Sequence, residues 1–257
     1  MTFDFKSELR DKSLSDARIL GLVWAGSAAD SERFDEYSDF DFYLITTDSQ
    51  AEPMRQNLDW LPRFEEIAYW ARETSHGLKV VYQDGTILEY AVFTLDQLSN
   101  SVVNHYAVSI DKADVESRTQ AISAKTEPKS HETVEDHLAI IYTLLMIAIG
   151  RARRGEKMIA GQFVRSYAAL HLIRAVKKTF DSQDISKRDV LDPWRRFELE
   201  YPEIGAKLNT AIAQEVEAAC WAIAELTADI FAEISSIPAA GNQTLQLRFG
   251  PSALGGI

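Results

Sequence analysis

A short alternation of acidic and aromatic residues constrains this chain more than any other feature. Asp39, Phe40, Asp41 and Phe42 begin a run that continues as Tyr-Leu-Ile-Thr-Thr, and its aromatic and β-branched residues favour a strand from Phe40 onward. Successive side chains of a strand point to opposite faces of the sheet. The two carboxylates therefore share one face and the two phenylalanines share the other.

Two further features accompany this pair of aspartates. Glu89 lies among apolar residues in Ile-Leu-Glu-Tyr-Ala-Val, the second of two strand-like runs separated by Asp-Gly, which is a hairpin signal. Gly26-Ser27 follows a short apolar run of strand length, residues 21–25. A glycine allows close backbone approach, and a serine hydroxyl together with free amides can hold a phosphate.

Three carboxylates in one cleft would repel one another and would be costly to remove from water. A divalent cation removes this cost, and magnesium prefers hard carboxylate oxygens while keeping positions open for substrate phosphates. Two such ions can activate an attacking oxygen and stabilise a leaving pyrophosphate. We therefore predict that Asp39, Asp41 and Glu89 form a magnesium site.

The order of these elements along the chain resembles the DNA polymerase beta-type nucleotidyltransferase superfamily, in which Gly-Ser precedes an Asp-x-Asp strand and a distant third acid. The helical second half contains Gly-Arg-Ala-Arg-Arg-Gly-Glu from Gly150, Asp-Pro-Trp-Arg-Arg-Phe-Glu from Asp192, and Tyr201-Pro202. This half resembles the antibiotic nucleotidyltransferases that modify aminoglycosides or lincosamides. Many family members carry Arg-Gly a few residues after Gly-Ser, where this chain has Ala-Ala-Asp from Ala28.

The resemblance implies a role for each motif. Gly26 and Ser27 would bind the triphosphate of ATP or another NTP, and Asp39 and Asp41 would hold magnesium. Glu89 would either complete the metal site or act as the general base for the acceptor hydroxyl. The implied enzyme transfers a nucleoside monophosphate, most simply AMP, to a small aminoglycoside- or lincosamide-like acceptor and releases pyrophosphate, an activity associated with antibiotic resistance.

Two other functions fit the same motifs. The chain could modify a protein partner, as the nucleotidyltransferase antitoxins do, or it could be a non-catalytic module that binds nucleotide. The acceptor and the oligomeric state are not determined by the sequence.

The pattern of the sequence changes along the chain from mixed strand and helix signals to helix signals, and this indicates two domains. We expect an α+β fold: a catalytic domain over residues 1–120, with a mixed sheet and helices, followed by a helical bundle domain over 131–237 that binds the acceptor. The helices expected here span residues 7–20, 53–73, 134–153, 160–180, 193–200 and 204–234. Residues 121–130 have the composition of a linker, and the Gly- and Pro-rich residues 238–257 are expected to be a poorly ordered tail.

Composition excludes several classes of protein. The net charge of the 257 residues is −12, which argues against a duplex-nucleic-acid binder. Residues 1–130 hold 13 Lys and Arg against 23 Asp and Glu, a net charge of −10, which suits a cationic acceptor.

The sequence also argues against a membrane-spanning or secreted protein. The longest apolar stretch has about 13 residues from Leu138, and a membrane span needs about 20. The single cysteine, Cys220, is expected to be a buried thiol and cannot form a disulfide within the chain, which fits a reducing compartment. The first residues are polar and do not have the pattern of a signal peptide. We therefore expect a cytoplasmic protein.

Overall fold

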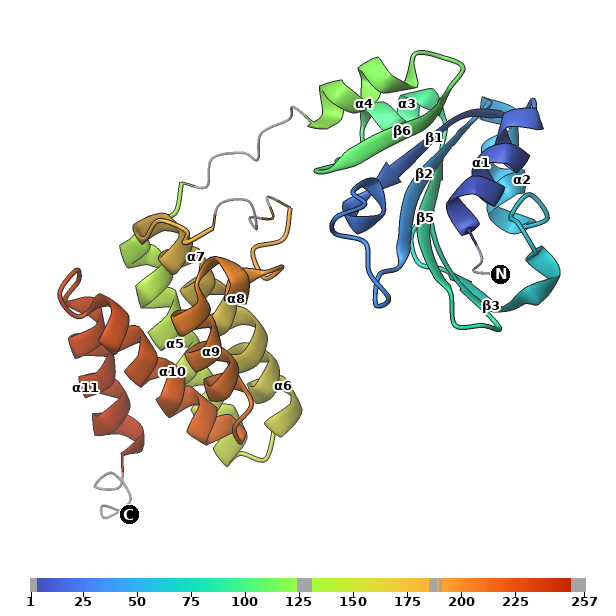
Figure 1. Ribbon diagram of the computed structural model, residues 1–257. Helices are drawn as coiled ribbons and strands as arrows, with labels where there is room; N and C mark the ends of the chain where they lie inside the picture. The colour runs from blue at the N-terminus through green and yellow to red at the C-terminus, as the bar shows by residue number, and fades with distance from the viewer. Residues whose placement is uncertain (1–3, 124–130, 185–188, 190, 251–257) are drawn as a thin grey trace. The chain divides into compact units, whose positions relative to one another are not determined.

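The computed structural model describes residues 4–123, 131–184, 189 and 191–250, and the chain divides into two compact units between residues 127 and 128 (Figure 1). The first unit combines a mixed sheet with helices, and the described residues of the second form helices joined by loops. The expected fold class, an α+β half followed by a helical half, is confirmed.

Six strands form the sheet of the first unit, in the order β3-β4-β5-β2-β1-β6. Their bounds are β1 Ile19–Ala25, β2 Phe40–Thr46, β3 Ile67–Arg72, β4 Gly77–Tyr82, β5 Ile87–Phe93 and β6 Tyr106–Asp111. The β2–β5 pair is parallel and the other neighbouring strands are antiparallel. The expected strand from Phe40 and the expected hairpin at Asp84-Gly85 are thus both present.

One face of the sheet is covered by α1 (Phe5–Ser15) and α2 (Ala51–Gln56), as Figure 1 shows. The core there contains Phe42 and Tyr90, whose rings stack with their centroids 4.8 Å apart. The opposite face is covered at β1 and at the end of β2 by α3 (Leu95–Ser99) and α4 (Val115–Ser123), which form a smaller apolar cluster. The first residues of β2 and β5 lie outside that cluster.

Two helices expected in this unit are wrong in their extent. The segment 53–73 contains only the end of α2, then the turn η3 (Phe64–Glu66) and strand β3. The apolar residues of this segment have the spacing of a helix, but they lie in different local structures. Trp60 is buried beside the sheet, and Ile67 begins a strand that pairs with β4. The helix expected over 7–20 ends at Ser15, because Ile19 and Leu20 belong to β1.

The second unit is built around α5 (Val134–Arg153), which has the bounds expected from the sequence. Thr133 begins it through a capping box with Asp136. The helices that follow are α6 (Lys157–Gln162), the π-helical segment η4 (Phe163–Ala168), α7 (Ala169–Thr179), α8 (Phe197–Glu200), α9 (Pro202–Ile212), α10 (Val216–Phe231) and α11 (Ile237–Phe249). Cys220 is fully buried in α10, as expected.

Three expectations for this unit are corrected by the structure. The helix expected over 193–200 is confined to α8, because residues 193–196 form a turn. The single helix expected over 204–234 is two helices, α9 and α10, because the chain turns at residues 213–215. The expected tail contains α11, whose Gly241 packs against the ring of Tyr142 in α5. The expected linker overlaps the end of α4 at Ser123, and residues 124–130 and 251–257 lie outside the described residues.

Candidate active site

Three carboxylates meet where β2 and β5 begin. Asp41 and Glu89 are direct partners in the parallel β2–β5 pair, and Asp39 immediately precedes β2. One oxygen from each side chain lies within 4.8 Å of the others, and all three residues are partly exposed. The structure thus brings together the three acids that the sequence singled out, on one face of the sheet.

Strand alternation explains why these acids remain at the surface. Phe42 and Tyr90, the next residues of the same two strands, point to the opposite face and stack in the core. Burying this aromatic pair fixes the face on which the neighbouring carboxylates emerge. A turn closed by mutual hydrogen bonds between Asp35 and Ser38 leads the chain into Asp39.

Gly26 begins η1 (Gly26–Ala29), the turn that follows β1, and it lies against the acids. Its φ is +56°, a left-handed conformation that favours glycine. A Cβ atom at this position would lie 2.8 Å from Oδ2 of Asp41. The Gly26 N–H is donated to the carbonyl of His105 at 3.1 Å, so this amide is engaged within the protein. A phosphate would therefore meet other groups of η1, beginning with the partly exposed Ser27.

Lys6 of α1 holds the turn η1 in place. Its Nζ donates to the carbonyl of Ala28 at 2.6 Å and lies 4.5 Å from the ring centre of Phe34. Partial burial lowers the pKa of this lysine. The turn beside the acids is thus tied to the first helix of the unit.

A lysine that the sequence analysis did not single out also reaches the acids. Lys79 of β4 is the direct partner of Glu89 in the antiparallel β4–β5 pair, and its Nζ lies 3.2 Å from Oε2 of Glu89. Hydrogen bonds that Lys79 donates to Glu73 and then to Glu89 raise the pKa of Lys79. Counting outward from the Asp84-Gly85 hairpin would have found it, because residues 79 and 89 are equidistant from Asp84.

The negative charge of Asp41 also affects the pKa of a tyrosine on the same face of the sheet. Tyr43 lies two residues beyond Asp41 on β2, and its hydroxyl donates to the carbonyl of Val102 at 2.7 Å. Burial, followed by the negative charge of Asp41, raises the pKa of Tyr43 to about 12. This hydroxyl is therefore protonated at neutral pH.

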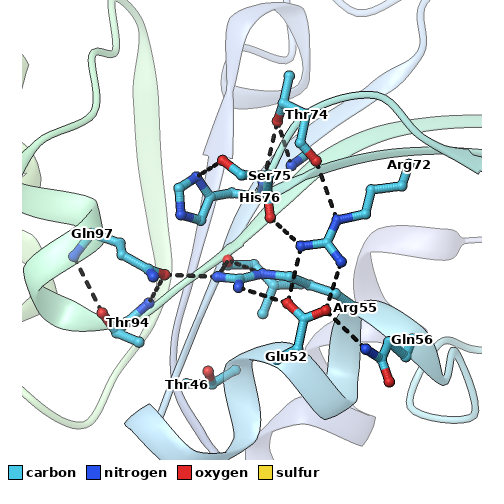
Figure 2. A network of polar contacts seen from close by, with 12 residues as sticks. Thr46, Glu52, Arg55, Gln56, Arg72, Thr74, Ser75, His76, Thr94 and Gln97 are labelled. Atoms are coloured by element: carbon cyan, nitrogen blue, oxygen red, sulfur yellow. Dashed lines mark hydrogen bonds and ion pairs between the residues drawn. The ribbon is translucent and has the colours of Figure 1, made fainter.

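A separate polar network fastens the β3–β4 turn (Figure 2). Arg55 is only 6% exposed and donates to the carbonyl of Val92 at 2.6 Å and to Gln97 at 2.7 Å. It also pairs with Glu52, which accepts from Arg72 at 2.6 Å. Hydrogen bonds from Arg72, Gln56 and Arg55 lower the pKa of Glu52 to about 2. The network thus joins α2, β3, β5 and α3.

The helical unit contains a buried histidine pair. His137 of α5 is fully buried, and its Nδ1 lies 3.0 Å from Nδ1 of His171 on α7. Two nitrogens at this distance share one proton, so one ring donates and the other accepts. Burial and the neighbouring His171 lower the pKa of His137, while Glu132, 4.0 Å from its Nε2, opposes this shift.

The donor set in the first unit fits a divalent cation. Its three groups are carboxylates, the hard oxygen ligands that magnesium prefers, and they lie close enough together to bind one ion. We find no other group of three such ligands among the described residues. Asp39, Asp41 and Glu89 are therefore the residues that would hold a metal.

Comparison with known proteins finds similar solved structures but no family. No family model matches the chain, and no curated protein matches it. An aminoglycoside 6-adenyltransferase from Bacillus subtilis is 13% identical, with 93% of this chain and 90% of that chain covered and a TM-score of 0.32. A nucleotidyltransferase-like protein from Exiguobacterium sibiricum 255-15 is 12% identical, with 97% and 76% covered and a TM-score of 0.31. At these TM-scores, the case for a function rests on the site itself.

No helix in the described part of the chain combines the length and the apolar character needed to cross a bilayer.

Proposed function

We propose that the chain is a magnesium-dependent nucleotidyltransferase that transfers a nucleoside monophosphate, AMP from ATP in the first instance, to a hydroxyl of a small acceptor. The observation that carries this proposal is the cluster of Asp39, Asp41 and Glu89, with oxygens within 4.8 Å of one another beside the Gly26 turn. Catalysis is assigned to residues 1–120 because all of these groups lie there. Acceptor binding is assigned to residues 131–237.

Each residue then has a role that its position allows. Asp39 and Asp41 bind the cation, and Ser27 with the backbone of η1 orients the triphosphate. Glu89 binds the cation or accepts the proton of the acceptor hydroxyl as that oxygen attacks the α-phosphate and pyrophosphate leaves. A bound magnesium ion would neutralise the carboxylates and the charge that develops on the phosphates.

The acidity of the first unit supports a cationic acceptor, such as an aminoglycoside or a lincosamide. Residues 1–130 have a net charge of −10, and only part of it would be neutralised by a metal. This negative charge would not attract a neutral hydroxylated acceptor. Comparing cationic with neutral acceptors therefore tests the acceptor class.

The experiment is a screen for pyrophosphate release with each NTP against aminoglycosides, lincosamides and neutral hydroxylated metabolites. Asp39→Asn and Asp41→Asn are expected to lower transfer by at least about 100-fold, since each removes a charged ligand. The matched control is Asp48→Asn, the same change at an exposed position in η2 (Asp48–Gln50). Full activity of either triad variant would refute the proposal.

Glu89→Gln separates the two roles left open for this residue. A variant that binds metal normally but turns over slowly identifies Glu89 as the base, whereas loss of metal binding identifies it as a ligand. Binding of ATP and metal without pyrophosphate release from any acceptor would favour a nucleotide-binding module. Transfer to a protein alone would favour the antitoxin-like function.

A further inference from the structure

One lysine is shared between an acid of the proposed metal site and an acid outside it. The Nζ of Lys79 lies 3.2 Å from Oε2 of Glu89 and 3.2 Å from Oε1 of Glu73. Glu89 faces Asp41 across β2–β5, whereas Glu73 follows the end of β3. The ammonium group therefore contacts two carboxylates at once, and only one of them belongs to the triad.

The backbone holds this arrangement in place. Lys79 and Glu89 are paired in the β4–β5 ladder, so their side chains emerge next to each other on one face. Glu73 is held by a hydrogen bond from its N–H to the carbonyl of Gly77 at 3.0 Å, within the β3–β4 turn. The preceding residue, Arg72, is anchored to Glu52 of α2 in the network of Figure 2.

The charges are placed so that Lys79 and a divalent cation would compete. A carboxylate oxygen bound by an ammonium group is a poorer ligand, and two cations that share one carboxylate repel each other. Lys79, Glu89 and Glu73 are 45%, 45% and 51% exposed, so solvent screens these pairs and keeps them weak. A metal ion could therefore displace the lysine, at a cost in affinity.

Resting on the proposed function, we propose that Lys79 is a positioning residue that sets the metal affinity of the triad by competing for Glu89. Glu73 accepts the ammonium group when the cation occupies Glu89. The site thus binds free metal weakly, and the negative charge of a triphosphate is needed to offset the lysine. Such a site favours a metal–nucleotide complex over the metal alone.

The two partners of the lysine give predictions of opposite sign. Lys79→Met removes the competitor and is expected to tighten Mn²⁺ binding by about two- to fivefold, in keeping with a partly exposed ion pair. Glu73→Gln removes the alternative partner, leaves the lysine on Glu89, and is expected to weaken Mn²⁺ binding by a similar factor. A lysine that only stabilises the hairpin would not produce this reversal.

The test is titration of the full chain with Mn²⁺ alone, followed by electron paramagnetic resonance of the free ion at constant pH and ionic strength. Lys157→Met and Glu65→Gln are the controls, since they make the same charge changes at exposed positions outside the cluster. Their Mn²⁺ affinities are expected to equal that of the wild type. Lys79→Arg keeps the charge in a partly exposed ion pair and is expected to remain within about twofold of the wild type.

The outcomes separate this inference from the function on which it rests. If the wild type and Asp41→Asn bind Mn²⁺ equally, the triad is not a metal site and the proposed function fails. If Asp41→Asn loses binding while Lys79→Met and Glu73→Gln match the wild type or shift in the same direction, the competition is overturned and the proposed function stands.

Discussion

Gly26 and Asp41 are in such close contact that a Cβ atom on the glycine would lie 2.8 Å from Oδ2 of the aspartate. The carboxylate thus occupies space that any other residue at position 26 would need. The glycine of the Gly-Ser motif therefore leaves room for the Asp41 carboxylate, in addition to adopting the left-handed conformation of the turn.

Gly26→Ala is therefore expected to displace the Asp41 carboxylate and to lower Mn²⁺ affinity by at least about tenfold. The matched control is Gly85→Ala, because Gly85 also has a positive φ, +87°, but a Cβ atom added there would meet no atom within 4 Å. Both variants bear the backbone strain of about 1–2 kcal/mol. Titration with Mn²⁺ should show a loss in the first variant alone, and equal affinities would contradict the steric argument.

The sequence predicted the acids but not their neighbours. Asp39 and Asp41 follow from strand alternation, and Glu89 from its place in a hairpin strand, because both patterns are local. Strand β3 was predicted as a helix because Trp60, Phe64 and Ile67 have helical spacing although they lie in three different local structures. Its pairing with β4 is a tertiary contact that no window of sequence contains.

The contacts around the acids were missed for a related reason. The approach of Gly26 to Asp41 joins the end of β1 to the start of β2. Lys79 carries no pattern of its own, and only the strand register shows that it faces Glu89. A residue type at a given spacing identifies a candidate, whereas the electrostatics of the site depend on the pairing of strands.

Arg55→Met is expected to destabilise the first unit by about 2–3 kcal/mol. The guanidinium group is buried and donates hydrogen bonds to the carbonyl of Val92 and to Gln97, and it pairs with Glu52. Its removal takes both of its hydrogen bonds from the Val92 carbonyl and weakens the network of Figure 2. Urea unfolding followed by tryptophan fluorescence measures the change. Arg10→Met is the control, since Arg10 is half exposed and pairs only with its neighbour Asp11 among the described contacts. A shift no larger than that of Arg10→Met would show that the network adds no stability.

Gly241→Ala is expected to destabilise the helical unit by about 2 kcal/mol. The added Cβ would lie 2.3 Å from Cγ of the Tyr142 ring, and overpacking of this kind outweighs the better helix propensity of alanine. Gln243→Ala, on an exposed position of the same helix, should be neutral or slightly stabilising. Thermal unfolding compares the two, and a more stable Gly241→Ala protein would mean that α11 does not pack on α5.

The histidine pair predicts that the helical unit loses stability on acidification. Burial lowers the pKa of both His137 and His171 in the folded chain, so below pH about 6.5 the unfolded chain binds more protons. Stability is complete above that pH and falls as the pH drops toward the folded pKa values. His171→Asn should flatten this dependence in thermal unfolding measured across the acid range. His131→Asn, an exposed change outside the pair, should keep the slope of the wild type.

The pairing of β2 with β5 also has a consequence for how the chain folds. A slip of one residue between these strands would turn Glu89 toward the core and Tyr90 toward water, so the carboxylates meet in one register only. The loop that this parallel pairing closes contains α2, β3 and β4, and non-local pairing of this kind is slow. Under the proposed function, a refolding chain should therefore acquire its affinity for Mn²⁺ in the last kinetic phase, and metal uptake would report that the sheet is complete.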